Sequence, residues 1–326
     1  MTIYSLLIND KQKDRIMNKD QIKKDIADMI IKAMEENGSN FMQSWVDSGM
    51  PRNGHGRYYS SINLFSLWIA KKVGNHNSNV WLTFKQINKL GGMVNKGEHG
   101  TYVVGWFTYE KDRVAQRGAK KGQTVTDTGV APRWYKVFNI DQTNLDEAKL
   151  KLPKQAHAIS DVDEYVANTN ADIRIDNGAD GCSYHPLFDR INMQHKDKFF
   201  AIDGSTATEN YYATLLHELT HWTGHRTRNN RIGITLEDID LRDHKLRAEL
   251  YAYEELVAEI GSAIQCCILG VSSGVKKSSA KYLNGWKKSI KDNPDVIFKA
   301  CSDAQKGVNF IEKLQVEATK QVKKVA

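Results

Sequence analysis

The sequence predicts an α+β protein of two domains, and three observations lead to this prediction. The chain of 326 residues is long enough to bury two hydrophobic cores. Its first half combines helical patterns with two segments rich in β-branched and aromatic residues, whereas helical patterns dominate its second half. Residues 151–160 read as a linker around Pro153. We therefore expect a mixed domain over residues 1–150 and a mainly helical domain with a small antiparallel sheet over residues 161–326.

Composition places the chain among globular proteins of the cytoplasm. Hydrophobic residues make up 40% and charged residues 26% of the sequence, and no apolar run approaches the length of a membrane span. The first fifteen residues lack the pattern of a secretory signal. The four cysteines show no paired metal spacing, which favours reduced thiols. We expect a cytoplasmic location and no association with a membrane.

The positive charge is concentrated in the first half. Residues 1–150 hold 22 Lys/Arg against 15 Asp/Glu, whereas residues 151–326 hold 24 of each, and five of the seven tryptophans also lie in the first half. A basic domain with many aromatic residues is typical of proteins that contact phosphates and stack on bases. An ordinary basic domain with an aromatic core has the same composition, so both interpretations stay open.

The first half contains three predicted helices and two predicted strands. Periodicity predicts a helix from Lys19 to Glu36, and Ser61 and Thr83 are the expected N-caps of the next two helices. The strands are expected at Thr101–Tyr109 and Arg133–Ile140. The basic segment between them, residues 111–132, is interpreted as a mobile hairpin loop. Such a loop either touches nucleic acid or is a solvated insertion.

The second half begins with short elements and continues with a long helix. Asp161 is the expected cap of a short helix, and the strand-like pieces lie at Ile173–Ile175, Cys182–His185 and Arg190–Met193. An edge strand here is able to bind a peptide through its main chain. After the segment Tyr211–Arg231, the next strong helical pattern is Leu246–Leu269.

The segment from Tyr211 to Arg231 carries the motif H-E-x-x-H as His217, Glu218 and His221. Residues four apart share one face of a helix, so the two imidazoles can bind one Zn²⁺. Glu218 lies where a carboxylate can take a proton from a metal-bound water. Two surface histidines are the alternative, but the apolar residues around them indicate a buried helix, in which unpaired polar groups are costly.

The motif leaves the third metal ligand undefined. Thr227 occupies the position where a longer zinc motif, that of the metzincins, has its last histidine, and His225 is out of register. Acidic residues gather in the helix Leu246–Leu269, at Glu249, Glu254, Glu255 and Glu259. The four-residue spacing of Glu255 and Glu259 resembles the arrangement of gluzincins. That resemblance implies Glu255 as the ligand and Glu259 as the residue that orients a ligating histidine, with Glu254 as the main rival.

Both halves resemble the ArdC antirestriction family, whose front domain is shared with TraC-type plasmid primases. In the first half the resemblance lies in PRNGHGRYYSSINLFSLW, VWLTFKQINKLGGMVNKGEHGTYVVGWF and WYKVFNIDQTNL. In the second half it lies in YYATLLHELTHWTGH, YEELVAEIGSAI and the helical tail. The segment HRTRNNR departs from the family pattern, which leaves the roles of Arg228 and Arg231 open.

The resemblance implies an N-terminal domain that binds single-stranded DNA and a C-terminal zincin-like metallopeptidase domain. Candidates for phosphate contacts lie in the matched loops and helices, at Arg52, Arg57, Lys85, Lys89 and Lys96. Stacking candidates are Tyr58, Tyr59 and Trp81, although core packing is the favoured role for each ring taken singly, because rings supply most of the buried area of a small domain.

The resemblance also implies an antirestriction protein of a mobile element or phage that acts in a bacterial host. Zn²⁺ is the expected metal, although Mn²⁺ and Co²⁺ suit the same ligands. A host restriction protein or another DNA-associated protein is the expected target or substrate. Two alternatives remain, a protease that clears proteins from DNA and a DNA-binding protein with a structural zinc site.

Overall fold

The computed structural model describes residues 19–38, 41, 49–118, 121–150, 161–175, 181–202, 204–231, 234, 243–272 and 277–325. The linker expected at residues 151–160 lies outside this set. Within the described residues, mixed helix and sheet confirm the α+β class. None of their helices is both long enough and apolar enough to cross a membrane.

The first half is built on a four-stranded sheet with the order β1-β2-β4-β3. Its strands are β1 (Arg52–Asn53), β2 (Val80–Thr83), β3 (Thr101–Val114) and β4 (Thr124–Asn139). Its helices are α1 (Lys19–Asn37), α3 (Ile62–Val73) and α4 (Phe84–Lys89). β1 runs parallel to β2, and the other pairs are antiparallel. Two short 3-10 helices, η3 (Ile140–Gln142) and η4 (Glu147–Lys149), follow β4.

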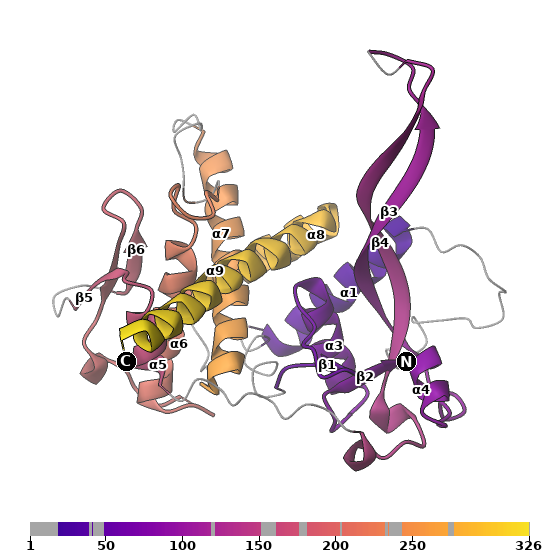
Figure 1. Cartoon of the computed structure of the whole chain (residues 1–326). Coiled ribbons are helices and arrows are strands. Elements are labelled where there is room, and N and C mark those ends of the chain that lie inside the picture. The colour runs from indigo at the N-terminus through magenta and orange to yellow at the C-terminus, as the bar shows by residue number, and fades with distance from the viewer. Residues whose placement is uncertain are drawn as a thin grey trace.

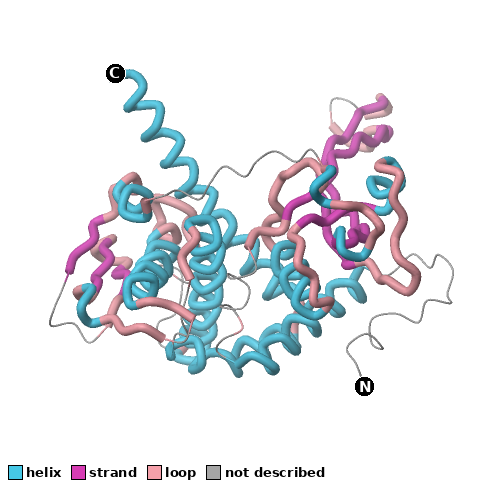
Figure 2. The backbone as a smooth tube through the Cα atoms, turned by 90° about the horizontal axis from the view of Figure 1, so that it is seen from below, coloured by secondary structure: helices cyan, strands magenta, loops and turns pink. Residues whose placement is uncertain are grey.

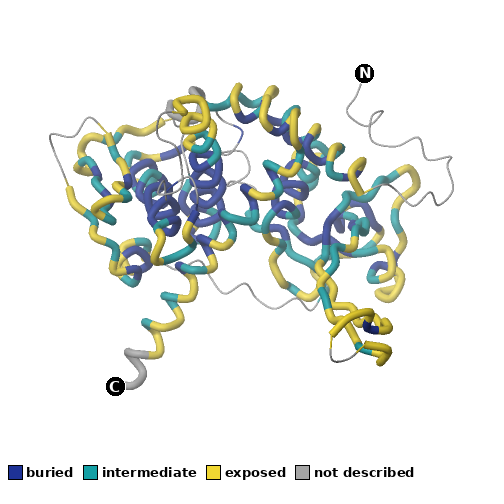
Figure 3. The backbone as a smooth tube through the Cα atoms, turned by 90° about the horizontal axis from the view of Figure 1, so that it is seen from above, coloured by how far each residue is buried: buried dark blue, intermediate teal, exposed yellow. Residues whose placement is uncertain are grey.

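The loop expected at residues 111–132 is mostly strand. β3 and β4 pair without interruption from Thr101 opposite Val137 to Val114 opposite Thr124. The prediction of a loop was wrong because a two-stranded ladder satisfies its backbone groups without a large apolar face, and alternating Thr and Val residues favour that conformation. The result is an exposed ribbon that extends beyond the sheet (Figures 1 and 3).

Helix caps show where local patterns were sufficient. Thr83 forms a capping box with Gln86, and Asp161 accepts hydrogen bonds from the backbone of the helix that it begins, as predicted. Ser61 precedes α3 but makes no side-chain cap, because its positive φ of 55° turns the chain differently. Its backbone N–H instead donates to Gln305 at 3.2 Å. The cap predicted at Ser61 was therefore wrong.

The second half combines a small sheet with five α-helices among its described residues. The helices are α5 (Val162–Ala167), α6 (Ala207–Trp222), α7 (His244–Leu269), α8 (Lys277–Asp292) and α9 (Asp295–Val325). The strands are β5 (Asp172–Ile175), β6 (Ser183–His185) and β7 (Arg190–Met193), and a 3-10 helix η5 (Lys196–Lys198) follows them. β6 and β7 are antiparallel, as expected, but β5 runs parallel to β7. β7 lies between β5 and β6 in the sheet. Because β7 runs opposite to β6 and in the same direction as β5, the sheet is mixed.

The main hydrophobic core contains residues of both halves of the chain. Phe41, which follows α1, contacts the ring of Trp286 in α8, and Trp134 of β4 contacts Phe298 of α9. Lys23 also forms an ion pair with Asp295 at 2.6 Å. Helices of the two halves accordingly lie side by side (Figure 2). The limits at 150 and 161 stay a prediction about domains, but the two halves share a core.

Candidate metal centre

Helix α6 presents the H-E-x-x-H motif in a buried environment. The helix begins with a capping box in which the side chain of Thr206 bonds to the Glu209 backbone and Glu209 bonds back. His217, Glu218 and His221 are all buried in its last two turns. The burial that the surrounding apolar residues predicted is therefore present, and these polar groups require partners.

The Nε2 atoms of both histidines converge on Glu255 of α7. His217 Nε2 lies 3.2 Å from His221 Nε2, and the Glu255 oxygens lie 3.6 Å and 3.5 Å from these two nitrogens. One ligand atom from each of the three residues falls within 4.8 Å of the others. Two imidazoles and one carboxylate are a donor set that divalent zinc-like ions accept. The residues present therefore fit a metal ion.

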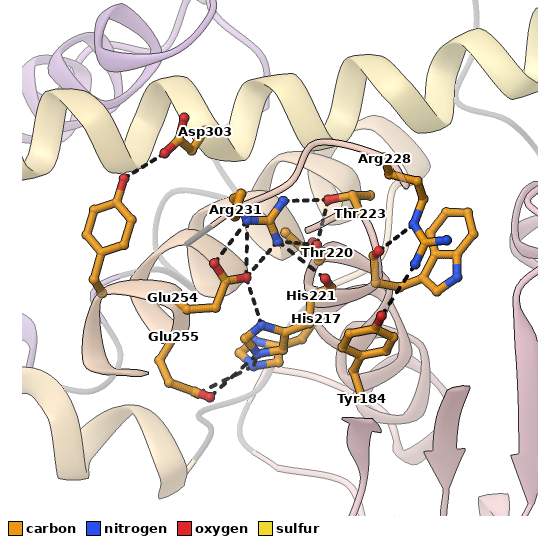
Figure 4. A network of polar contacts seen from close by, with 12 residues as sticks. Tyr184, His217, Thr220, His221, Thr223, Arg228, Arg231, Glu254, Glu255 and Asp303 are labelled. Atoms are coloured by element: carbon orange, nitrogen blue, oxygen red, sulfur yellow. Dashed lines mark hydrogen bonds and ion pairs between the residues drawn. The ribbon is translucent and has the colours of Figure 1, made fainter. Parts of the chain in front are cut away.

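Glu254 is engaged elsewhere. One of its oxygens lies 3.1 Å from His221 Nδ1, on the side of the ring away from Glu255. The Arg231 guanidinium binds the same carboxylate through two nitrogens, at 2.6 Å and 2.9 Å (Figure 4). Arg231 also donates to the carbonyl of Thr220 at 2.6 Å. The two adjacent glutamates thus have different positions: Glu255 lies beside the Nε2 atoms of both histidines, and Glu254 lies at the Nδ1 side of the His221 ring.

His217 has a corresponding acidic neighbour on its other nitrogen. Glu259 Oε1 lies 3.5 Å from His217 Nδ1, and both side chains are buried. Each histidine therefore has its Nε2 directed at Glu255 and its Nδ1 close to another carboxylate. Such outer carboxylates orient imidazoles and make them better ligands.

Mutual contacts set the ionisation of the cluster. Burial opposes a charge on His221, but its hydrogen bonds to Glu254 and Glu255 outweigh that effect and raise its pKa to about 10. Burial likewise opposes the charge of Glu255, whose pKa is nevertheless held far below its usual range by hydrogen bonds to His217 and His221. The pKa of Glu254 is also lowered, since Arg231 outweighs the effect of burial. The carboxylates around His221 therefore favour a positive charge at this position.

Glu218 is held against the edge strand of the small sheet. Its Oε2 accepts a hydrogen bond from the backbone N–H of Tyr184 in β6 at 2.8 Å. The Tyr184 hydroxyl donates to Asp189 at 2.9 Å, and Asp189 also pairs with Arg228 through both oxygens. Arg228 lies over the ring of Trp222 at 3.9 Å from its centre. These contacts tie the β6–β7 turn to the end of α6 and fix the position of Glu218.

Comparison with known proteins decides the family. Residues 20–138 match the family model described as the N-terminal domain of anti-restriction factor ArdC, and residues 160–303 match a zincin-like metallopeptidase. The crystal structure of the antirestriction ArdC protein from plasmid R388, in its metal-free form, superposes with a TM-score of 0.70 at 32% identity, over 90% of this chain and 98% of that chain. This chain belongs to the ArdC antirestriction family.

Further relatives of this ArdC family member include a metal-bound structure and longer proteins. The Mn(II)-bound form of the R388 protein superposes with a TM-score of 0.67 at 31% identity, over 90% of this chain and 97% of that chain. An uncharacterized protein y4eC of Sinorhizobium fredii is 27% identical over 90% of this chain and 92% of its own length. Two DNA primases TraC of Escherichia coli are 30% identical, over 88% and 91% of this chain but only 19% and 28% of their own lengths. The chain thus spans a minor part of those primases.

The predicted DNA contacts of this ArdC family member differ in accessibility. Arg57, Lys85, Lys89 and Lys96 are exposed, and Tyr58 is 44% exposed. Arg52 is half-buried and pairs with Glu147 at 2.9 Å. Tyr59 is half-buried, and burial raises the pKa of its hydroxyl. The exposed side chains are free to reach a phosphate or a base, whereas Arg52 and Tyr59 already have partners.

Trp81 was the wrong choice for a stacking residue. It is 0% exposed and packs in a small cluster with Leu67, Val103 and Val137. Trp81 lies on β2, between β1 and β4, so its ring points into the domain and cannot receive a base. An alternating strand pattern shows that two faces differ, but it does not show which one is covered.

Sequence reasoning missed several residues that complete the site. The roles of Arg231 and Arg228 had been left open, and the backbone of Tyr184 was not foreseen as a partner of Glu218. One signal was present, because Glu218, Glu254, Glu255 and Glu259 place four carboxylates near two histidines. A buried excess of negative charge requires a cation. The sequence does not indicate which of the two arginines, Arg228 or Arg231, provides this cation.

Proposed function

We propose that this ArdC family member is an antirestriction protein of a mobile element or phage that binds single-stranded DNA and carries a gluzincin-like zinc peptidase site. It acts in the cytoplasm of the bacterial host. The observation that carries the proposal is the buried convergence of His217, His221 and Glu255, with Glu218 beside them. Three protein ligands leave a position open for water, which is typical of catalytic rather than structural zinc sites.

His217, His221 and Glu255 would hold the metal, and Glu259 and Glu254, which lie near the Nδ1 atoms of His217 and His221, would orient the two imidazoles. Zn²⁺ suits this set, while Mn²⁺, which is bound in the R388 relative, and Co²⁺ suit the same donors. When bound, such an ion supplies a Lewis acid that lowers the pKa of a water and polarises a carbonyl.

Glu218 is the general base. It takes a proton from the attacking water and passes it to the leaving amine. The hydrogen bond from the Tyr184 N–H holds one carboxylate oxygen and leaves the other available for the proton. A substrate peptide pairs with the main chain of the small sheet at this edge, a mode of binding that accepts varied side chains. A host restriction protein or another DNA-associated protein is the proposed target.

The first half supplies the contacts with single-stranded DNA. Its charge excess, its ArdC-type domain and its likeness to a part of the TraC primases support this assignment. The exposed residues Arg57, Lys85, Lys89 and Lys96 are placed to bind phosphates, and Tyr58 is placed to stack on a base.

Replacement of Glu218 by Gln tests the peptidase proposal. The amide cannot accept the proton, so we expect hydrolysis of an unstructured protein such as casein to fall by about 10²- to 10⁴-fold while bound zinc, measured by mass spectrometry, stays at the wild-type level. Protection of incoming plasmid DNA against restriction, measured in the same variant, shows whether antirestriction requires hydrolysis.

Glu255→Ala is the matched variant for the metal. It should lose the zinc as well as the activity, because it removes one of three ligands. Wild-type hydrolysis in Glu218→Gln would exclude Glu218 as the base. Full metal retention in Glu255→Ala would exclude Glu255 as the third ligand. Absence of hydrolysis in the zinc-loaded wild-type chain would favour a binding protein with a non-catalytic metal.

A further inference from the structure

The ribbon formed by the outer parts of β3 and β4 has no partner among the described elements, and its two faces differ in chemistry. Side chains alternate between faces along a strand, and directly paired residues share a face. The register places Phe107 opposite Ala131, Tyr109 opposite Gly129 and Gly105 opposite Arg133. One face therefore carries two aromatic rings and Arg133. We call this the aromatic-basic face.

Charges follow the same division. Lys111 and Arg113 lie on the aromatic-basic face beyond Tyr109, whereas Glu110 and Asp112 lie on the opposite face together with Trp106. Asp127 is the acid of the aromatic-basic face, and it is paired with Arg113. Residues 101–139, which comprise the whole of β3 and β4 and their connection, hold seven Lys/Arg against three Asp/Glu, a net charge of +4. Of the seven basic residues, Lys111, Arg113 and Arg133 lie on the aromatic-basic face, Lys136 lies on the opposite face, and the other three lie in sequence between Val114 and Thr124.

Two glycines let the rings lie close to the backbone. A Cβ atom at Gly129 would lie 2.7 Å from the ring of Tyr109, and one at Gly105 would lie 2.8 Å from the ring of Phe107. Each ring therefore packs against the backbone of a glycine. Nevertheless, Phe107 is 46% exposed and Tyr109 is 48% exposed. Rings that are held in place yet accessible lose little entropy when a base stacks on them.

The guanidinium of Arg133 lies 5.5 Å from the centre of the Phe107 ring. A cation in this place can keep its contact with the ring and also bind a phosphate. Residues two apart on a strand are separated by about 7 Å, whereas stacked bases in a duplex follow each other at about 3.4 Å. Bases that occupy both rings must therefore be separated from each other, as only a single strand allows.

We propose that the aromatic-basic face is a stacking platform for single-stranded DNA, on which Phe107 and Tyr109 receive bases while Arg133 and Lys111 bind phosphates. This inference rests on the proposed binding of single-stranded DNA. It extends that function from the globular part of the first half to the ribbon (Figure 1).

The experiment measures binding of the full chain to a fluorescent oligothymidylate by anisotropy at constant salt. The double variant Phe107→Ala with Tyr109→Ala loses both stacking surfaces, so its Kd should rise by at least about tenfold. The exchange Phe107→Tyr with Tyr109→Phe preserves both rings and should bind within about twofold of the wild type. Trp106→Ala is the matched control, because Trp106 is 68% exposed but lies on the opposite face. It should leave the Kd unchanged.

Three outcomes would overturn the inference. If the double alanine variant binds like the wild type, the proposed platform is rejected, whereas the proposed binding of single-stranded DNA is not. If Trp106→Ala raises the Kd as much as the double alanine variant does, the aromatic-basic face is not the specific binding face. No detectable binding by the wild-type chain rejects the proposed DNA function and the platform together. Circular dichroism of each variant confirms that the fold is unchanged.

Discussion

The adjacent residues Glu254 and Glu255 illustrate how much one position matters in a buried site. Successive residues on a helix point about 100° apart, so the two carboxylates meet different sides of the same pair of imidazoles. Glu255 lies near both Nε2 atoms, whereas Glu254 lies between His221 Nδ1 and Arg231. Arg231 is itself buried, and its charge compensates that of the Glu254 carboxylate. Arg231 thus supports the site from behind His221, on the side of the ring away from Glu255.

Replacement of Arg231 by Met should destabilise the protein strongly. It leaves the Glu254 carboxylate buried without its main partner, and the loss of one member of a buried pair costs about 3–5 kcal/mol. We expect urea unfolding of the metal-free protein to show this loss. Arg228→Met is the control, because its partner Asp189 is partly exposed and can be solvated, so the loss should be smaller. A loss below about 1 kcal/mol in Arg231→Met would contradict the role of Arg231.

At the scale of elements, the site depends on a close approach of α6 and α7. A Cβ atom at Gly261 of α7 would lie 2.4 Å from the Thr220 side chain of α6. Gln265 donates to Thr220 Oγ1 at 2.8 Å, and the Ser262 hydroxyl donates to the Ala213 carbonyl at 2.9 Å. These contacts fix the register between the helix that carries the histidines and the helix that carries the glutamates.

Gly261→Ala should therefore affect both stability and metal affinity. The added methyl group forces the two helices apart, and overpacking of this kind costs about 1–3 kcal/mol. The same shift moves His217 and His221 away from Glu255, so the zinc Kd measured by competition with a chelator should rise. Gly285→Ala on α8 is the control, because nothing lies within 4 Å of its added Cβ. Unchanged zinc affinity in Gly261→Ala would show that the spacing of α6 and α7 does not limit the site.

At the scale of the whole molecule, the shared core couples the two halves. Trp286 of α8 contacts Phe41 near α1, and its Nε1 donates to the Ala252 carbonyl of α7 at 2.6 Å. Contacts of α9 with Trp134 and Ser61 extend the junction. Since the same helices support the proposed metal site and contact the first half, the two halves are expected to unfold together.

Trp286→Ala should test this coupling. Loss of a large buried ring costs about 3–5 kcal/mol. We expect hydrogen exchange of the full chain to accelerate by a similar factor for amides of α3 and of α6. Trp106→Ala, on the exposed ribbon, should leave both unchanged. Acceleration confined to α6 and α7 would show that the halves unfold independently.

Local patterns were enough to predict much of this protein. The H-E-x-x-H spacing, the acidic helix, most helix limits, two N-caps and the uneven charge all follow from residues close in sequence, as did the family resemblance. These features depend on periodicity and on side-chain types, which a single segment displays.

Only the tertiary structure decided which side each residue faces. It placed Glu255 near both Nε2 atoms and Glu254 against Arg231, buried Trp81, and extended β3 and β4 into a ribbon with one aromatic-basic face. The physical reason is that each outcome depends on contacts between segments far apart in sequence. His221 and Glu254 lie 33 positions apart in the sequence, and the segment between them carries no local signal of how their helices are rotated against each other.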